Sequence, residues 1–282
     1  MTTTAVAAQT DLRSQYDRDG WVAAHAVVDE GLMAEARSHV DWLLAKHPGV
    51  RPEQLHHHLM TNDPFWVRLI SDPRLLDVVE QFIGPDIALF ASHYIAKRPH
   101  DGQSVLWHQD GSFWPLEPME VVTLWLAVDD ADVENGCLRV LSGTQNQRLL
   151  KLDEMERQDD GRNVLGTGIR PSELDESQAV DVILKAGDVE IHHPNIIHGS
   201  NANISARWRR GLTIRYIPTS TRIVSEERWA GAFLLRGRAH PNVDNRYHPF
   251  PLFVGGEHMP FHDWQAWNEY ARSWNATNGF AP

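Results

Sequence analysis

The sequence predicts a mainly β fold with flanking helices, arranged as an antiparallel barrel or a double-sheet jelly roll. In the first third of the chain, apolar residues recur at the spacing of amphipathic helices. From Ile87 onward, short runs rich in β-branched and aromatic residues alternate with Gly, Pro, Asn and Asp. Asn135-Gly136 and Gly187-Asp188 lie between such runs, where tight turns are expected. Many short strands joined in this way are typical of barrels and jelly rolls.

Two helical segments are expected before the strands. The apolar residues of the first, residues 32–44, form one stripe at the helical period. The second covers residues 63–83, with Asp63 as its N-cap and Pro64 in its first turn. Pro73 divides this segment into two short helices, because proline interrupts the hydrogen bonds of a helix.

The expected strands share a high content of β-branched and aromatic residues and are bounded by turn-forming residues. They cover residues 88–95, 121–128, 137–141, 180–184, 189–192 and 211–217.

One domain spanning residues 1–282 is expected, because no repeat, low-complexity tract or linker interrupts the chain. Residues 1–14 are small and polar and are expected to form a loose tail. Residues 145–178 are polar and lack periodicity, which predicts a lid-like insertion over a site. Residues 219–282 carry many aromatic side chains, so a C-terminal extension packed on the domain is expected.

The charge and cysteine content exclude several classes of partner and location. The chain has 26 Lys and Arg against 38 Asp and Glu, a net charge of −12, so a nucleic-acid partner is not expected. No run approaches the roughly 18 to 20 apolar residues of a membrane helix, so no membrane partner is expected either. Residues 1–10 lack the features of a secretory signal, and the one cysteine, Cys137, fits a reducing compartment. A cytoplasmic location is therefore expected.

The segment Trp107-His108-Gln109-Asp110 carries the first chemical signal. Residues two apart on an extended chain point to the same face, so His108 and Asp110 can reach one cation together. The pattern is weak by itself, because the chain contains 16 histidines.

A second signal follows about ninety residues later, where Gly187-Asp188 predicts a turn and a short strand leads to His198. Two histidines and one carboxylate on one face leave open metal positions, as non-haem Fe(II) oxygenases require. His192 and His193 compete with His198 for this role, although alternation allows only one of those two to point inward.

Arginines near the next predicted strand provide the third signal. Arg209 follows His198 by eleven residues, and its guanidinium can bind a carboxylate through two hydrogen bonds. It would hold the far end of a dicarboxylic acid whose other end chelates the metal, with the Ser200 hydroxyl as a second contact. Arg207 and Arg210 are the alternative residues for this role, and the eleven-residue spacing from His198 favours Arg209.

These segments together resemble the phytanoyl-CoA dioxygenase family of Fe(II)- and 2-oxoglutarate-dependent oxygenases. The resemblance extends weakly from about Tyr16 to Pro218. The residues that carry it are His108-Gln109-Asp110, Asn135-Gly136-Cys137-Leu138, Leu141-Ser142-Gly143-Thr144, Gly187-Asp188, His193-Pro194, His198-Gly199-Ser200 and Arg209.

The resemblance implies a double-stranded β-helix, which is a cupin-like jelly roll, and a hydroxylase that uses Fe(II), 2-oxoglutarate and O2. It implies that His108, Asp110 and His198 are the catalytic iron ligands. The 2-oxoglutarate contacts that it implies are Arg209, Ser200, His93 and Trp125. Related halogenases have Gly or Ala at the carboxylate position, so Asp110 favours hydroxylation over halogenation.

The expected reaction is hydroxylation of an unactivated C–H bond of a small metabolite, with release of succinate and CO2. Trp107, Phe113 and Trp114 flank the proposed ligands and are expected to contact the substrate. The run His56-His57-His58 is expected in a partly solvated surface turn and not in a metal site. Two alternatives remain open, namely a zinc-dependent hydrolase that uses the same triad and a non-catalytic jelly-roll protein that binds a ligand.

Overall fold

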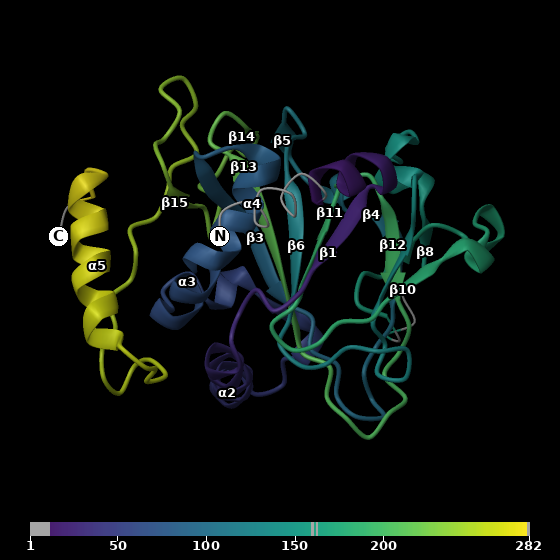
Figure 1. Ribbon diagram of the computed structural model, residues 1–282, viewed down its shortest axis with the longest axis horizontal. Coiled ribbons are helices and arrows are strands. Elements are labelled where there is room, and N and C mark those ends of the chain that lie inside the picture. Colours follow the sequence, from purple (N-terminus) through teal and green to yellow (C-terminus); the bar gives the residue numbers. More distant parts are fainter. Residues whose placement is uncertain (1–11, 159–160, 162, 281–282) are drawn as a thin grey trace, which may run out of the picture.

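Figure 1 shows the chain in a computed structural model, which describes residues 12–158, 161 and 163–280. Two main antiparallel sheets form the body of the molecule, and helices α2, α3 and α4 lie to one side of it. The predicted mainly β fold with flanking helices is confirmed. Among the described residues, no helix is long and apolar enough to cross a membrane.

The larger sheet has seven strands in the order β1-β11-β6-β13-β3-β15, and β2 also pairs with β3. Every pairing in this sheet is antiparallel. Its strands are β1 Trp21–Ala24, β2 Leu55–His56, β3 Ile87–Tyr94, β6 Val122–Ala127, β11 Val189–His192, β13 Gly211–Pro218 and β15 Phe233–Arg236.

The smaller sheet has four antiparallel strands in the order β10-β7-β12-β4. They are β4 Val105–Gln109, β7 Leu138–Leu141, β10 Val180–Val182 and β12 Ile197–Ser200. Two short pairs complete the β structure, formed by β5 Leu116–Glu117 with β14 Arg222–Ile223 and by β8 Glu156–Arg157 with β9 Thr167–Gly168.

Two of the helices, α3 and α4, begin where local sequence signals place them. Asp63 caps one helix by accepting a hydrogen bond of 2.9 Å from the Trp66 amide, and Pro73 opens the next, so the predicted division into two short helices is confirmed. Residues 12–14, which the sequence assigns to a loose tail, are helical within residues 12–19, and residues 1–11 lie outside the described part. The α-helices that follow this first helical segment are α2 Glu30–Lys46, α3 Pro64–Ile70, α4 Pro73–Ile83 and α5 Trp264–Thr277.

The two faces of the larger sheet have opposite chemistry. On β13, Leu212 and Ile214 join the main hydrophobic core together with side chains of α2, α3 and α4. Thr213 and Arg215 alternate with them and line a cavity on the opposite face. The helices therefore cover the apolar face, and the polar face is turned toward the smaller sheet.

Segments outside the sheets pack against both sides of this body. Phe250 and Trp267, from the aromatic residues of 219–282, belong to the same core cluster as the helices. In the insertion 145–178, Ile169 packs on the outer face of the smaller sheet, while Leu165 lines the cavity. Residues 159, 160 and 162 of this insertion are not among the described residues.

Gly187 provides a test of the predicted turn before β11. Its φ of 88° is a conformation that side chains disfavour, and an added Cβ would overlap the carbonyl oxygen of Val28. Gly187→Ala is therefore expected to lower the free energy of unfolding by about 1–3 kcal/mol, measured by urea denaturation. Gly255→Ala, at a position with open space and no positive φ, is the control and should change stability little. Equal stability of the two variants would contradict this account of the turn.

Candidate metal centre

A cavity of about 290 Å³ lies between the polar face of the larger sheet and the inner face of the smaller sheet. Strands β3, β6, β11 and β13 line one wall, and β4 and β12 line the other. Its polar residues include the three residues that the sequence predicts as metal ligands.

His108 and His198 lie directly opposite each other on the paired strands β4 and β12, with ring centroids 4.1 Å apart. Nδ1–H of His108 donates to the carbonyl oxygen of Leu106 at 2.8 Å, and Nδ1–H of His198 donates to that of Ile196 at 3.1 Å. A carbonyl can only accept, so both rings keep Nε2 free of hydrogen and ready to bind a metal.

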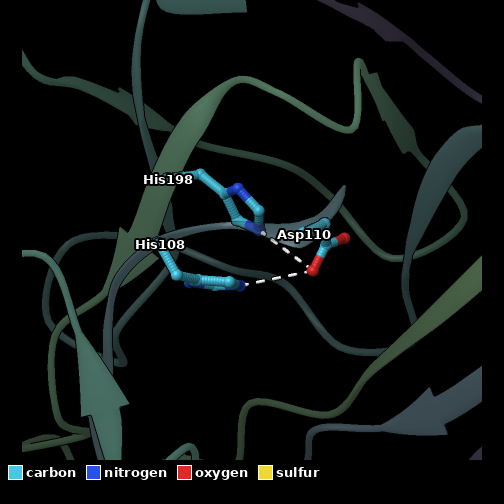
Figure 2. A group of neighbouring side chains, drawn as sticks. All are labelled: His108, Asp110 and His198. Carbon is cyan, nitrogen blue, oxygen red and sulfur yellow. Dashed lines mark ion pairs between the residues drawn. The ribbon is translucent and has the colours of Figure 1, made fainter. Parts of the chain in front are cut away.

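Asp110 lies just beyond the end of β4 and turns one oxygen toward both of these histidines. Its Oδ1 is 3.3 Å from Nε2 of His108 and 4.0 Å from Nε2 of His198, as Figure 2 shows. Its other oxygen, Oδ2, accepts a hydrogen bond of 3.0 Å from the Thr123 hydroxyl on β6. Burial opposes ionisation, but the Arg215 charge and the histidine contacts hold the pKa of Asp110 well below its usual value.

This group is suited to a divalent metal ion. The two Nε2 atoms and the carboxylate oxygen lie within 4.8 Å of one another, and all three residues are buried. Burial, followed by electrostatic repulsion from the neighbouring imidazoles of His108 and His192, lowers the pKa of His198 well below its usual value, so the His198 ring is neutral. Two neutral imidazoles and one carboxylate form the donor set of the non-haem Fe(II) oxygenases.

His192 and His193, the competing histidines, point in different directions. His192 faces the cavity, with Nε2 3.5 Å from Oδ2 of Asp110 and Nδ1 2.8 Å from Oε2 of the buried Glu190. Burial opposes its charge, but Glu190 and Asp110 raise the pKa of His192 to about 9. His193 does not line the cavity and instead accepts a hydrogen bond from the Asn195 amide.

Arg209 brings a buried positive charge into the cavity. Its side chain is 2% exposed, and it donates from Nη1 to the carbonyl oxygen of Ile95 at 2.9 Å. Its Nε has no hydrogen-bond partner among the described residues. Burial lowers the pKa of Arg209 to about 10, which still leaves it charged at neutral pH. A buried guanidinium with an unpaired donor is suited to an anionic ligand.

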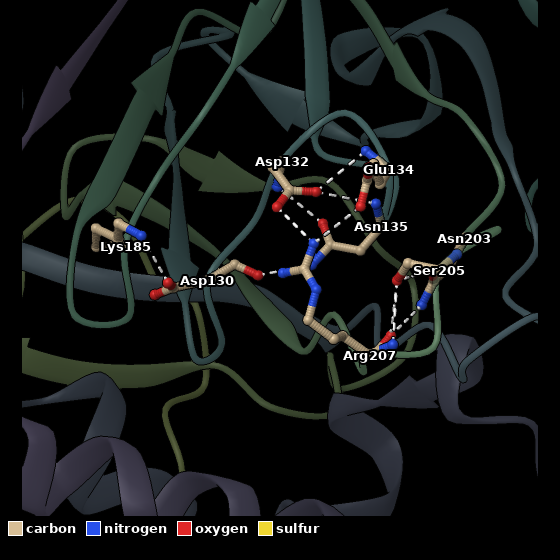
Figure 3. A network of polar contacts seen from close by, with 8 residues as sticks. All are labelled: Asp130, Asp132, Glu134, Asn135, Lys185, Asn203, Ser205 and Arg207. Atoms are coloured by element: carbon tan, nitrogen blue, oxygen red, sulfur yellow. Dashed lines mark hydrogen bonds and ion pairs between the residues drawn. The ribbon is translucent and has the colours of Figure 1, made fainter.

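The two neighbouring arginines form ion pairs outside the cavity. Arg207 is about half exposed, and its Nη2 lies 2.6 Å from Oδ2 of Asp132 in the polar network of Figure 3. Nη1 of Arg210 lies 3.0 Å from Oδ2 of Asp129. Of the three candidates, only Arg209 lines the cavity.

Ser200 lies two residues after His198 on β12 and also faces the cavity. Its hydroxyl oxygen accepts a hydrogen bond of 2.7 Å from Nζ of Lys97, which also donates to the carbonyl oxygen of Asn201. Because its oxygen is already engaged, the hydroxyl hydrogen of Ser200 remains available to a ligand. Lys97 is fully buried, and the sequence analysis did not identify it.

His93 and Trp125 line the same end of the cavity, on either side of Thr213 in the larger sheet. Nε2–H of His93 donates to the carbonyl oxygen of Glu53 at 2.6 Å, which fixes the ring. The guanidinium of Arg209 lies 5.4 Å from the centre of the Trp125 ring, so this aromatic face supports the buried cation.

The prediction that Trp107 contacts the substrate is wrong. Trp107 neighbours His108 on β4, so its side chain points to the opposite face of the sheet. It packs there with Leu141 and Ile169, and the Arg139 guanidinium lies 5.2 Å from its ring centre. Phe113 and Trp114, the other two aromatic candidates, both line the cavity.

The histidine run is partly solvated, as the sequence predicts, with His56 and His58 exposed. His57, in contrast, is 7% exposed and donates from Nδ1–H to the carbonyl oxygen of Ser92 at 3.3 Å. His56 and His57 both line the cavity. The pairing of β2 with β3 carries this segment over the cavity, which is why His57 is buried between two exposed histidines.

Glu190 and Arg215 also belong to the surroundings of the site, and the sequence patterns above do not predict them. The sequence could have indicated Arg215. Residues 209, 211, 213 and 215 share one face of an extended chain, and Arg209 is already predicted to face the site. Glu190 lies two residues before His192 on β11, so the two side chains share one face of that strand.

A jelly roll with two histidines and one carboxylate in its cavity defines a class of protein, the non-haem Fe(II) oxygenase fold with its metal-binding triad. The chain belongs to the family described as "Phytanoyl-CoA dioxygenase (PhyH)", whose sequence pattern matches residues 16–211.

Two curated relatives illustrate the range of the family. The peroxisomal phytanoyl-CoA dioxygenase of Rattus norvegicus is 32% identical over 162 residues, which cover 56% of this chain and 47% of the relative. The chain thus spans about half the length of that relative. The L-proline trans-4-hydroxylase of Streptomyces griseoviridis is 28% identical over 232 residues, 73% of this chain and 85% of the relative.

Solved structures share the fold. The non-heme monooxygenase ThoJ superposes with a TM-score of 0.66 at 23% identity and covers 95% of each chain. The epimerase SnoN, in complex with Fe3+, alpha ketoglutarate and nogalamycin RO, superposes with a TM-score of 0.62 at 24% identity, covering 77% of this chain and 86% of SnoN. These likenesses confirm the predicted jelly roll.

His57 gives a testable pH dependence. Burial, followed by the charge of His58, lowers the pKa of His57 to about 3, against about 6.5 in an unfolded chain. Between these values the unfolded chain binds one more proton, so His57 makes stability fall as pH falls through this window. His57→Gln should reduce the slope of unfolding free energy against pH by about 1.4 kcal/mol per unit between about pH 4 and 6. His58→Gln, at an exposed position, is the control, and parallel slopes for all three proteins would contradict the assignment.

Proposed function

We propose that this protein is an Fe(II)- and 2-oxoglutarate-dependent oxygenase that hydroxylates an unactivated C–H bond of a small metabolite. The observation that carries the proposal is the convergence of His108, Asp110 and His198 within 4.8 Å in a buried cavity that also contains Arg209. The two histidines and the aspartate match the protein ligands of Fe(II) in this class of enzyme, and Arg209 matches the binding of a dicarboxylic cosubstrate. Membership of the phytanoyl-CoA dioxygenase family supports the same conclusion.

In this proposal, Nε2 of His108, Nε2 of His198 and a carboxylate oxygen of Asp110 hold the iron. Bound Fe(II) with 2-oxoglutarate and O2 supplies the oxidising chemistry and releases succinate and CO2. The hydrogen bonds from Nδ1 of both histidines to backbone carbonyls orient the rings before the metal arrives. The Thr123 hydroxyl orients the carboxylate in the same way.

The cosubstrate is held by the other end of the cavity. Arg209 binds the far carboxylate of 2-oxoglutarate, and the free hydroxyl hydrogen of Ser200 donates to it. His93 and Trp125 form the walls beside this carboxylate. Because Arg209 is almost fully buried, the charge pair forms away from water, where it is stronger.

The substrate occupies the rest of the cavity. Phe113 and Trp114 form part of its apolar wall, and their position shortly after β4, with the Phe113 ring 6.0 Å from that of His108, supports a substrate beside the iron ligands. The L-proline trans-4-hydroxylase among the relatives supports a small metabolite as the substrate class.

We further propose that residues 1–282 act as one domain in the cytoplasm. Aromatic residues of 219–282 share the main core with the helices, which supports a packed C-terminal extension. Leu165 at the cavity supports a lid role for residues 145–178. A single, buried cysteine, Cys137, supports a reducing compartment.

The iron assignment predicts a spectroscopic signal. Metal-free protein given Fe(II) and then 2-oxoglutarate without oxygen should develop the weak visible charge-transfer band of the chelate. His198→Ala should abolish the band, because one of three protein ligands is lost. His193→Ala, a neighbour that does not line the cavity, should retain it. A folded wild-type protein that gives no band would contradict the oxygenase, and turnover with zinc in the absence of oxygen would favour a hydrolase.

The cosubstrate assignment predicts an affinity change. Arg209→Met should raise the 2-oxoglutarate concentration needed for half of the band by about a hundredfold, because one charged and doubly hydrogen-bonded contact is lost. The anaerobic titration measures this directly. Arg207→Met removes an equal charge outside the cavity and should leave the titration unchanged. Similar affinities for both variants would place the cosubstrate elsewhere.

A further inference from the structure

A second arginine, Arg215, enters the cavity at a different place from Arg209. Its side chain extends from β13 and is only 12% exposed. The proposed binding of iron and 2-oxoglutarate leaves this residue without a role, although burying a guanidinium is costly unless an anion compensates it.

The two arginines lie at opposite ends of one row of side chains. Arg209, Thr213 and Arg215 all line the cavity, and Arg209 lies two residues before β13, in a β-bridge with Lys97. Residues six apart along an extended chain are separated by roughly 20 Å. Arg209 contacts Ile95 and the Trp125 ring, whereas Arg215 contacts Thr213 and approaches Asp110. One ligand of the size of 2-oxoglutarate, held by Arg209, therefore leaves Arg215 to a second ligand.

The guanidinium of Arg215 has unused hydrogen-bonding capacity. Nη1 donates to the Thr213 hydroxyl at 2.6 Å, and Nε has no partner among the described residues. Nη2 lies 3.7 Å from Oδ1 of Asp110, which is an ion-pair distance longer than a hydrogen bond. This oxygen is the one that faces His108 and His198, so the iron proposed above would compete for it.

A count of the charges in the site also leaves the positive charge of Arg215 without a balancing negative charge. In the proposed complex, the two positive charges of Fe(II) and the one of Arg209 balance Asp110 and the two carboxylates of 2-oxoglutarate. The Glu190 carboxylate already has a partner, because its Oε2 lies 2.8 Å from Nδ1 of His192. Burial lowers the pKa of Lys97 well below its usual value, which favours its neutral amine. Arg215 then adds one positive charge that a further anion would balance.

The surroundings of Arg215 are apolar and aromatic. Its guanidinium lies 5.6 Å from the centre of the Trp114 ring, and Phe90 packs edge-on against Trp114 with centroids 5.7 Å apart. Phe90 in turn stacks on Trp229, and all three rings line the cavity. A ligand at this end would meet one cation and a wall of aromatic rings.

We propose that Arg215 binds a carboxylate of the substrate, and that the substrate is a small carboxylic acid whose apolar part packs against Trp114, Phe90 and Trp229. The inference rests on the proposed function, because it assigns the substrate end of the same cavity. The planar fork of Arg215 suits a carboxylate, which forms two parallel hydrogen bonds with it.

The test compares carboxylic acids with neutral amides of the same shape. Binding of phenylacetate, 3-phenylpropanoate and hexanoate, each with its amide, is measured by calorimetry on the anaerobic protein saturated with Fe(II) and 2-oxoglutarate. The proteins are the wild type, Arg215→Met, Arg215→Lys and the control Arg222→Met, which removes an exposed arginine paired with Glu117. The charge-transfer band of each protein is recorded first, as a measure of an intact iron and cosubstrate site.

We expect at least one carboxylate to bind the wild type and Arg222→Met about tenfold more tightly than its amide. Arg215→Met should retain the band and lose this preference, and Arg215→Lys should retain part of it. The inference is overturned if no carboxylate binds the wild type more tightly than its amide, or if the preference survives in Arg215→Met. A band lost in Arg215→Met but retained in Arg209→Met would make Arg215 the cosubstrate residue and also overturn it. Absence of the band from the wild type would instead contradict the proposed function.

Discussion

Asp110 connects the two sheets, and the arrangement of the cavity depends on it. One carboxylate oxygen faces His108 and His198 of the smaller sheet, and the other accepts a hydrogen bond from Thr123 of the larger sheet. A buried carboxylate is stable only when hydrogen bonds and positive charges surround it. The same surroundings that stabilise this charge in the fold also direct its free electron pairs to one point, where a metal ion fits.

The two faces of the larger sheet have different roles: the outer face stabilises the fold, and the inner face carries residues of the site. Its outer face is apolar and packs against α2, α3 and α4, so hydrophobic burial fixes the positions of the strands. Its inner face can then carry Thr213, Arg215 and His192, which contribute little to hydrophobic stability. Because the backbone of each strand is fixed by its outer face, the inner side chains are held at defined distances, and smaller hydrophobic clusters around Trp125 and Phe90 flank them on the inner face.

Local sequence signals were sufficient for much of the fold. Proline and aspartate at the start of α3 and α4, and glycine at the turn before β11, act within a few residues, so the sequence alone locates these boundaries. Strand β15 and helix α5 were not predicted, because their sequences mix polar and aromatic residues without a clear period. These elements are ordered by contacts with the core, such as those of Trp267, which sequence periodicity does not report.

The sequence by itself determined that His108 and Asp110 share one face, because two residues on an extended chain are related by local geometry alone. It also determined the alternation that places Arg209 and Arg215 on one side of a strand. The tertiary structure alone decided that His198 lies beside His108, that Trp107 points away from the cavity, and that Arg215 approaches Asp110. The physical reason is strand register, since a shift of one residue between two distant strands would turn every side chain to the opposite face.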